Sequence, residues 1–108
     1  MISFEEFKKL DLRVAKVIKA ENVEGSKNLM RMEIDLGNEK RQIVAGISQF
    51  YKPEDLIGKE IIVIANLEPK TLFGLESKGM LLAAEDEKQK EPVLLIPDKE
   101  VPLGTKIC

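Results

Sequence analysis

The sequence predicts a small all-β protein, a single domain whose strands close into a barrel. Residues 30–36 alternate apolar and polar side chains, as a strand with one buried face does. The Gly37-Asn38 pair that follows is typical of a tight hairpin turn. Residues 61–65 are a continuous apolar run rich in β-branched side chains, which favours a strand buried on both faces. A chain of 108 residues can bury its own core without disulfides.

A short helix is expected at the N-terminus. Ser3 can cap it, and Glu6 stands three residues later, as in a capping box. Phe4, Phe7 and Leu10 would then form one apolar stripe. We expect this stripe to pack against the segments that follow.

Two strands flank the alternating segment and complete the first part of the barrel. A long strand begins at residue 11, and its adjacent apolar pair Val17-Ile18 breaks the alternation as a β-bulge would. A turn at 24–26 follows this strand. Residues 41–45 form the strand that returns from the Gly37-Asn38 hairpin.

The second half of the chain contains a small helix and further extended segments. Pro53 suits the first turn of the helix, and Gly58 ends it. A 14-residue connection follows the strand 61–65, and the strands after it are residues 80–84 and 93–96. The tail 101–104 then leads to a last extended segment.

This element order is that of an oligonucleotide-binding (OB) barrel. The predicted fold class is therefore all-β: a five-stranded OB-fold barrel with a short N-terminal helix, a small helix between the third and fourth strands, and extra C-terminal strands. A different small β-barrel or a meander is the alternative.

Composition argues against catalysis. The chain has no histidine and one cysteine, Cys108, which removes the usual zinc sites and the Cys-His and Ser-His-Asp constellations. Carboxylate pairs are available, but residues 85–87 are more typical of a solvated turn. We expect a non-catalytic domain without cofactor or metal. The single cysteine favours a cytoplasmic setting, and no apolar run is long enough to span a bilayer.

The net charge of −2 argues against a protein that coats nucleic acid indiscriminately. Residues 8–41 carry nine basic and six acidic side chains, whereas residues 42–108 carry eight basic and eleven acidic ones. The positive bias is therefore local, and charge alone does not predict RNA binding.

Several segments together resemble one family, the tRNA-binding domain of methionyl-tRNA synthetase C-terminal extensions, stand-alone tRNA-binding proteins and synthetase cofactors. The most specific segment begins Val63-Ile64-Ala65-Asn66-Leu67-Glu68-Pro69-Lys70. The resemblance runs in order over residues 7–108, and the other matching segments are residues 11–17, 34–37, 41–47, 58–59 and 77–84. Residues 23–26 resemble the methionyl-tRNA synthetase branch.

The resemblance implies a domain that binds tRNA without strong sequence preference, at the outer corner of the L-shaped molecule. It also implies a homodimer joined largely through the C-terminal half. The chain would be either the C-terminal domain or a separate β subunit of methionyl-tRNA synthetase, acting with the catalytic subunit. Two alternatives stay open: a peptide-binding, export-related chaperone on the same dimeric fold, and a purely structural dimerisation module.

The family's RNA-contacting loop corresponds to residues 66–80, and its candidate contacts are Asn66, Lys70, Ser77, Lys78 and Met80. The lysines would meet phosphates, and the serine hydroxyl a phosphate or a 2′-OH. The asparagine, the lysines and the methionine also have simpler interpretations, because asparagine makes turns, lysine is commonly solvated, and a methionine that opens an apolar strand is more often core.

A second group of candidates lies on the strands of the first half. Each residue alone is better explained as a salt bridge or ordinary surface charge, but as a cluster they could bind phosphates. They are Arg13, Lys16, Lys27, Arg31 and Arg41.

Two positions depart from the family pattern. Many relatives have a basic residue at the position that Phe73 occupies here, and another near the position of Glu68. Losing these charges should lower phosphate affinity and the salt dependence of binding. Phe73 could stack on a base if it is exposed, or bury itself beneath the loop.

Overall fold

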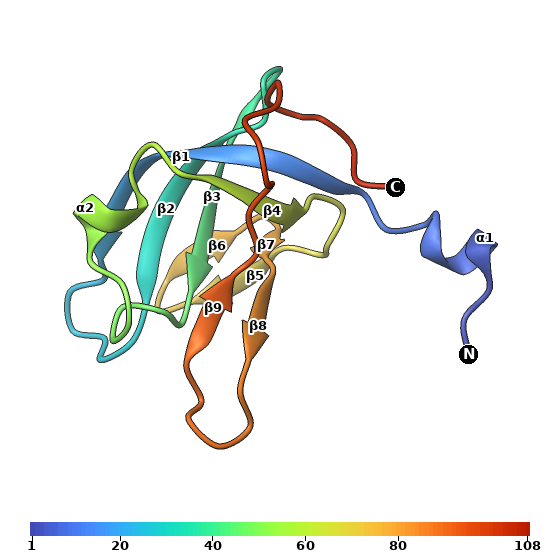
Figure 1. The fold of residues 1–108 in the computed structure, drawn as a ribbon. Helices are drawn as coiled ribbons and strands as arrows, with labels where there is room; N and C mark the ends of the chain where they lie inside the picture. The colour runs from blue at the N-terminus through green and yellow to red at the C-terminus, as the bar shows by residue number, and fades with distance from the viewer.

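The computed structural model describes residues 1–108, and its longest strand, β1, joins the two halves of an antiparallel barrel (Figure 1). The principal sheet has the order β3-β2-β1-β4-β7, and β5-β6 and β8-β9 form two-stranded sheets. The elements are α1 (Phe4–Phe7), β1 (Leu12–Asn22), β2 (Met30–Asp35), β3 (Lys40–Ala45), α2 (Pro53–Leu56), β4 (Glu60–Ile64), β5 (Lys70–Leu72), β6 (Leu75–Ser77), β7 (Met80–Leu81), β8 (Ala83–Glu85) and β9 (Pro92–Leu94).

Strand β1 pairs with β4 through its first half and with β2 through its second half. The register with β2 shifts between Val17 and Lys19, so Ile18 forms the predicted bulge. A bulge bends a strand and increases its twist, which allows β1 to pass from one side of the barrel to the other. Gly37 and Asn38 form the predicted hairpin turn between β2 and β3. The Leu36 amide closes this turn by donating a hydrogen bond to the Glu39 carbonyl at 2.8 Å.

The segment 77–80 closes the other edge of the barrel. Strand β7 pairs with β4, with Val63 opposite Leu81. On the opposite side the Lys78 amide donates to the Gln42 carbonyl of β3 at 2.9 Å. The sheet is therefore a nearly closed five-stranded barrel with α2 between β3 and β4, as predicted for an OB fold.

Side chains from every strand of the principal sheet fill the barrel. Met30, Met32 and Ile34 of β2 are buried at alternate positions, which confirms the predicted alternation. Strand β4 is buried on both faces as predicted: Ile61 and Val63 point into the core, and the backbone amide of Ile62 donates to Leu95 of the covering segment.

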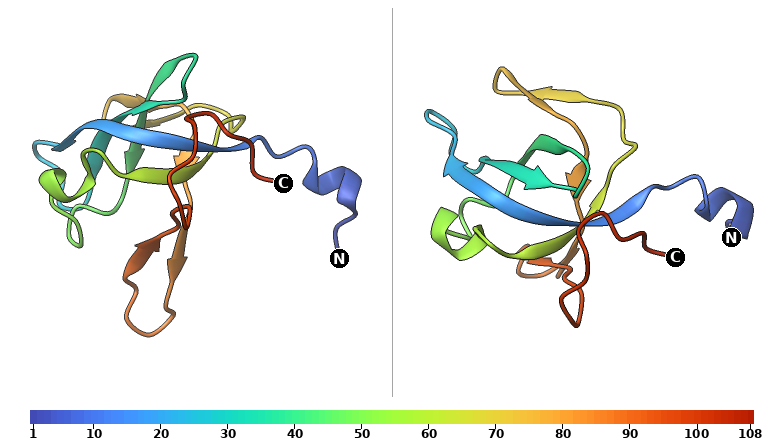
Figure 2. Two further views of the ribbon diagram at one scale, coloured as in Figure 1. Left: turned by 45° about the horizontal axis from the view of Figure 1, so that its top comes forward. Right: turned by 90° about the horizontal axis from the view of Figure 1, so that it is seen from above.

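The C-terminal tail forms the last extended segment that the sequence predicts. Its residues bond to the backbone of β1: the Val14 amide donates to Thr105 at 2.9 Å, Gly104 donates to Val14 at 2.7 Å, and Ile107 donates to Leu12 at 2.9 Å. The extra strands β8 and β9 form a hairpin that projects from the barrel (Figure 2).

Two predicted segments differ in detail. The connection 66–79 contains the hairpin β5–β6, with three residue pairs, which is too short to show a period in sequence. The strand expected over 80–84 divides at Leu82, whose amide donates to Ile62 while its carbonyl accepts from Leu95. Leu82 thus marks where the chain leaves the barrel for the projecting hairpin.

The N-terminal helix has the predicted cap but not the predicted packing. The Glu6 amide donates to the Ser3 hydroxyl at 3.1 Å, and the Ser3 amide donates to the Glu6 carboxylate at 3.3 Å. The expectation that the apolar stripe packs on following segments was wrong, because α1 extends away from the barrel and leaves Phe4 67% exposed (Figures 1 and 2). Both helices have four residues, so neither is long enough to cross a membrane.

Candidate nucleic-acid interface

The hairpin β5–β6 presents the two lysines of the predicted loop. Lys70 begins β5, is exposed, and stands opposite Ser77 of β6. Lys78 follows β6 and its side chain is 55% exposed, with Nζ 3.5 Å from the Glu76 carboxylate. An ion pair this exposed is weak, so Lys78 can exchange its partner for a phosphate at little cost.

Ser77 and Asn66 have polar groups that are already bonded within the chain. Ser77 is 2% exposed, and its hydroxyl accepts from the Val44 amide at 3.0 Å and donates to the Gly79 carbonyl at 3.1 Å. The Asn66 side chain accepts from the Asp11 amide at 2.9 Å and donates to the Lys9 carbonyl at 2.6 Å. These bonds fix both ends of the segment that carries the lysines.

Met80 is half-buried and packs against the barrel core. This is the structural role that a methionine at the start of an apolar strand commonly has.

The three arginines among the candidates are all paired with acidic neighbours. Arg31 Nε lies 2.6 Å from the Glu21 carboxylate. Arg41 lies 2.5 Å from the Glu39 carboxylate and also donates to the Ala65 carbonyl.

Arg13 bonds to Asp11 at 2.8 Å, and this hydrogen bond is the main cause that lowers the pKa of the Asp11 carboxyl. Because the carboxylate is ionised at neutral pH, the pair is intact there and neutralises one of the predicted phosphate contacts.

Lys16 and Lys27 form no ion pair within the chain. Lys27 is exposed in the turn between β1 and β2, two residues from Gly25, which lies beside the ring of Phe73 at the tip of the β5–β6 hairpin. Lys16 lies elsewhere, in a groove with Lys59 and Lys99 beside the end of α2. The structure therefore brings Lys27 toward the hairpin but leaves Lys16 apart from it.

Gln42 links the strand face to the hairpin, and the sequence reasoning missed it. Its side-chain oxygen accepts from Arg31 at 2.9 Å, and its side-chain nitrogen donates to the Glu76 carbonyl at 3.0 Å. Its backbone carbonyl accepts from the Lys78 amide at 2.9 Å. A glutamine on the polar face of a strand carries no signal for such a role, because the partner segment is 34 residues away.

The arrangement is a barrel side bordered by a short hairpin with exposed cations, a form that suits nucleic-acid backbone contact. No group of three or more acidic, cysteine or histidine side chains is placed to hold a metal ion.

Comparison with known proteins gives the same family. A family model described as "Putative tRNA binding domain" matches residues 12–106. The methionine–tRNA ligase of Methanothrix thermoacetophila is 56% identical over 107 residues, which are 99% of this chain and 16% of that protein. The chain thus spans about one sixth of the length of the curated relatives it matches.

Two solved structures share the complete fold. The MetRS related protein from Pyrococcus horikoshii is 40% identical with a TM-score of 0.94, covering 100% of this chain and 98% of that one. The chaperone CsaA from Bacillus anthracis is 39% identical with a TM-score of 0.91, covering 100% and 99%. The family match and these identities confirm the resemblance read from the sequence, and the chain belongs to the putative tRNA-binding domain family.

Proposed function

We propose that this domain is a non-catalytic tRNA holder that acts as the C-terminal domain or a separate β subunit of methionyl-tRNA synthetase. Membership of the tRNA-binding family is the observation that carries this proposal, together with relatives that are methionine–tRNA ligases. The domain binds tRNA through backbone and shape, without strong sequence preference. It raises the affinity of the synthetase for tRNA because tethering increases the local concentration of the substrate.

The exposed lysines of the β5–β6 hairpin are the proposed phosphate contacts. Lys70 and Lys78 lie on the same short hairpin, and Lys27 lies in the turn beside its tip. In this arrangement Asn66 and Ser77 serve the site by holding its backbone in place. With a net charge of −2 and phosphate contacts proposed for Lys27, Lys70 and Lys78 alone, we expect modest affinity and a shallow salt dependence.

Replacing both Lys70 and Lys78 with alanine should weaken tRNA binding and flatten its salt dependence. Each lost phosphate contact reduces the slope of log affinity against log salt by about 0.7–0.9, so the pair should reduce it by roughly 1.4–1.8. The measurement is a tRNA gel shift over a salt series with the wild type and the double variant.

The matched control replaces Lys88 and Lys99, which are exposed and lie outside the β5–β6 hairpin, so the change in net charge is the same. The control should bind nearly as the wild type does. If wild type shifts no tRNA even at low salt, the proposed function is wrong. If the Lys70/Lys78 variant binds as wild type, only the position of the contacts is wrong.

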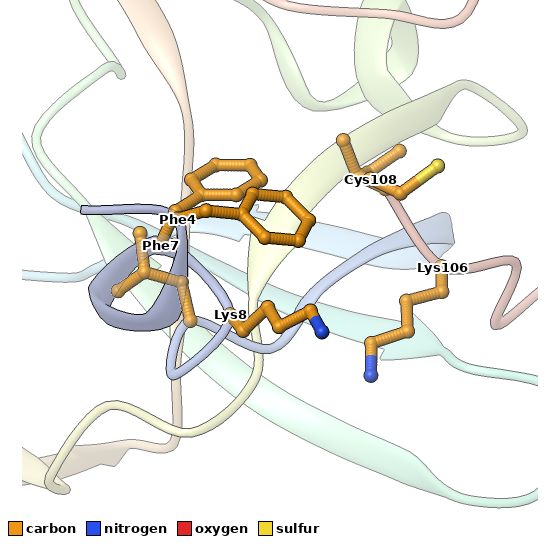
Figure 3. A pocket seen from close by; sticks show the side chains of 7 residues that line it. Phe4, Phe7, Lys8, Lys106 and Cys108 are labelled. Carbon is orange, nitrogen blue, oxygen red and sulfur yellow. The ribbon is translucent and has the colours of Figure 1, made fainter.

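We further propose that the domain forms a homodimer through its C-terminal half. Apolar side chains on and after β9 support this, since Val93, Leu95 and Ile96 are 54%, 42% and 57% exposed. Apolar surface gathered on one short segment is typical of an interaction site. The groove of about 440 Å³ between α1 and the C-terminal residues adds further apolar surface, including Phe4 and Phe7 (Figure 3).

The Ile96→Glu variant should shift the protein toward a monomer, because it would bury a charge in the proposed interface. Light scattering coupled to size exclusion measures the molar mass over a concentration series. Ile57→Glu is the matched control, because Ile57 is 52% exposed and lies at the end of α2. A monomeric wild type, or equal effects of the two variants, would contradict the proposed interface.

A peptide-binding chaperone is the second candidate function. Two solved structures with this fold are chaperones named CsaA, 39% and 29% identical to this chain, and the exposed apolar side chains fit such a role. The candidates differ in a direct test at low salt: a chaperone would bind an unfolded peptide and leave tRNA unshifted.

A further inference from the structure

We infer that Phe73 is a base-stacking residue, and that an unpaired nucleobase of the RNA lies on its ring beside the groove between the tip of the β5–β6 hairpin and the end of β1. This inference rests on the proposed tRNA-binding function and adds a contact of a different chemical kind. Three features of the molecule support it: the backbone conformation of Phe73, the exposure of its ring, and the charges around the groove.

The backbone of Phe73 is strained in a way its side chain does not explain. Phe73 and Gly74 are the central residues of the turn between the paired residues Leu72 and Leu75, with φ angles of 53° and 80°. Two successive positive φ angles are typical of a type I′ turn, where asparagine followed by glycine is preferred. A bulky aromatic residue is an outlier there, and such outliers cluster at functional sites.

The ring is presented to solvent rather than buried. Phe73 is 61% exposed, which answers the question the sequence left open. Its ring lies beside the turn at Gly25, where an added Cβ would be 3.5 Å from Cε2. A groove of about 350 Å³ adjoins the ring, and its other walls include Glu21, Glu24 and Arg31. The hairpin tip therefore lies beside the Gly25 turn, while Phe73 stays 61% exposed.

The charges around the groove favour a base over a phosphate. Glu21 and Glu24 contribute two carboxylates, and the one cation, Arg31, is already paired with Glu21 at 2.6 Å. The lining of the groove, which does not include Lys27, therefore disfavours a phosphate, but the face of a base is uncharged and stacks on aromatic rings. The amino groups on the edge of a base would meet the carboxylates as hydrogen-bond donors.

The lysines of the same hairpin provide the complementary contact. Lys70 precedes Phe73 by three residues of chain, roughly 10 Å along an extended strand. An RNA backbone held at Lys70 and Lys78 can therefore extend one unpaired base to the hairpin tip. Stacking is tolerant of sequence, because every base has a π-face, and this agrees with binding through shape.

Four variants of Phe73 test the inference in the tRNA gel shift. Phe73→Ala should lower affinity about 5- to 150-fold, the range expected for one lost stacking contact. The slope of its log affinity against log salt concentration should equal that of wild type, because no phosphate contact is lost. Phe73→Leu should lose as much affinity, since it keeps an apolar side chain but no aromatic face. Phe73→Trp should retain affinity.

Phe73→Asn separates binding from folding. It places asparagine before Gly74, the preferred pair for this turn, so its melting temperature should equal or exceed that of wild type while its affinity falls. A binding defect in this variant cannot be attributed to a damaged hairpin.

Phe73→Trp also supplies a direct optical readout, because the chain contains no other tryptophan. Titration with tRNA at low salt should quench its fluorescence as a base stacks on the indole. Fluorescence that stays unchanged while the gel shift reports binding would overturn the inference, as would wild-type affinity in Phe73→Ala or Phe73→Leu. Those results leave the proposed function intact, whereas wild type that binds no tRNA removes both.

Discussion

Replacing Gly79 with alanine is expected to destabilise the domain by about 2–5 kcal/mol. Gly79 has a φ of +110°, a conformation that side chains strain, and an added Cβ would lie 2.8 Å from the backbone carbonyl oxygen of Ile64. Ile64 belongs to β4 and is the pairing partner of Met80, so neither backbone can move without opening the barrel edge. The cost of the strained φ angle and the cost of the overlap with the Ile64 carbonyl oxygen therefore add in the destabilisation of Gly79→Ala.

Gly58→Ala is the matched control for this experiment. Gly58 has a φ of +89°, but an added Cβ would meet nothing within 4 Å. Gly58→Ala should lower the free energy of unfolding only by the cost of placing alanine in the left-handed conformation, about 1–2 kcal/mol. Urea unfolding of the three proteins measures the difference, provided that their m-values agree. Equal losses in the two variants would mean that the β4 carbonyl does not confine Gly79.

The main barrel could be predicted from sequence because its strands carry strong local signals. The alternation in β2, the Gly37-Asn38 turn and the β-branched run of β4 each report one strand or turn, and the bulge near Ile18 follows from a break in the alternation. These signals are short in range. They place residues on a face of a strand without reference to distant parts of the chain.

The loop that carries the candidate site could not be predicted in the same way. The β5–β6 hairpin turns at Phe73, a residue type that does not favour such turns, so the usual signal is missing. Gln42 and Ser77 act through bonds to segments more than 30 residues away. Asparagine and serine serve both turns and ligands, so residue type alone did not decide between the two roles.

The exposed stripe of α1 was mispredicted for a related reason. Periodicity indicates that Phe4, Phe7 and Leu10 share one face, but it does not say whether the face meets the same chain. The helix precedes β1 and extends away from the barrel, and a groove separates its apolar side chains from the C-terminal residues 106–108 (Figure 1).

Replacing Gly104 with alanine is expected to cost about 2–4 kcal/mol and to release the C-terminal tail from β1. Gly104 has a φ of +85°, and an added Cβ would overlap the carbonyl oxygen of Leu36. Gly37 faces the carbonyl of Leu103 in the same way, at 2.6 Å from its own added Cβ, so the hairpin turn and the tail cross with no space for a side chain on either.

Detachment of the C-terminal tail sets an upper limit to the decrease in the free energy of unfolding that Gly104→Ala can cause. If the strained tail detaches from β1, the protein loses the three backbone hydrogen bonds that join Gly104, Thr105 and Ile107 to this strand. At about 0.5–1.5 kcal/mol for each bond, the loss approaches that of removing residues 102–108 altogether. Urea unfolding of Gly104→Ala beside this truncation tests the limit, and hydrogen exchange at the Val14 amide, which donates to Thr105, reports the release. A loss well beyond that of the truncation would show that the strain is transmitted into the β2–β3 hairpin instead of being relieved by the tail.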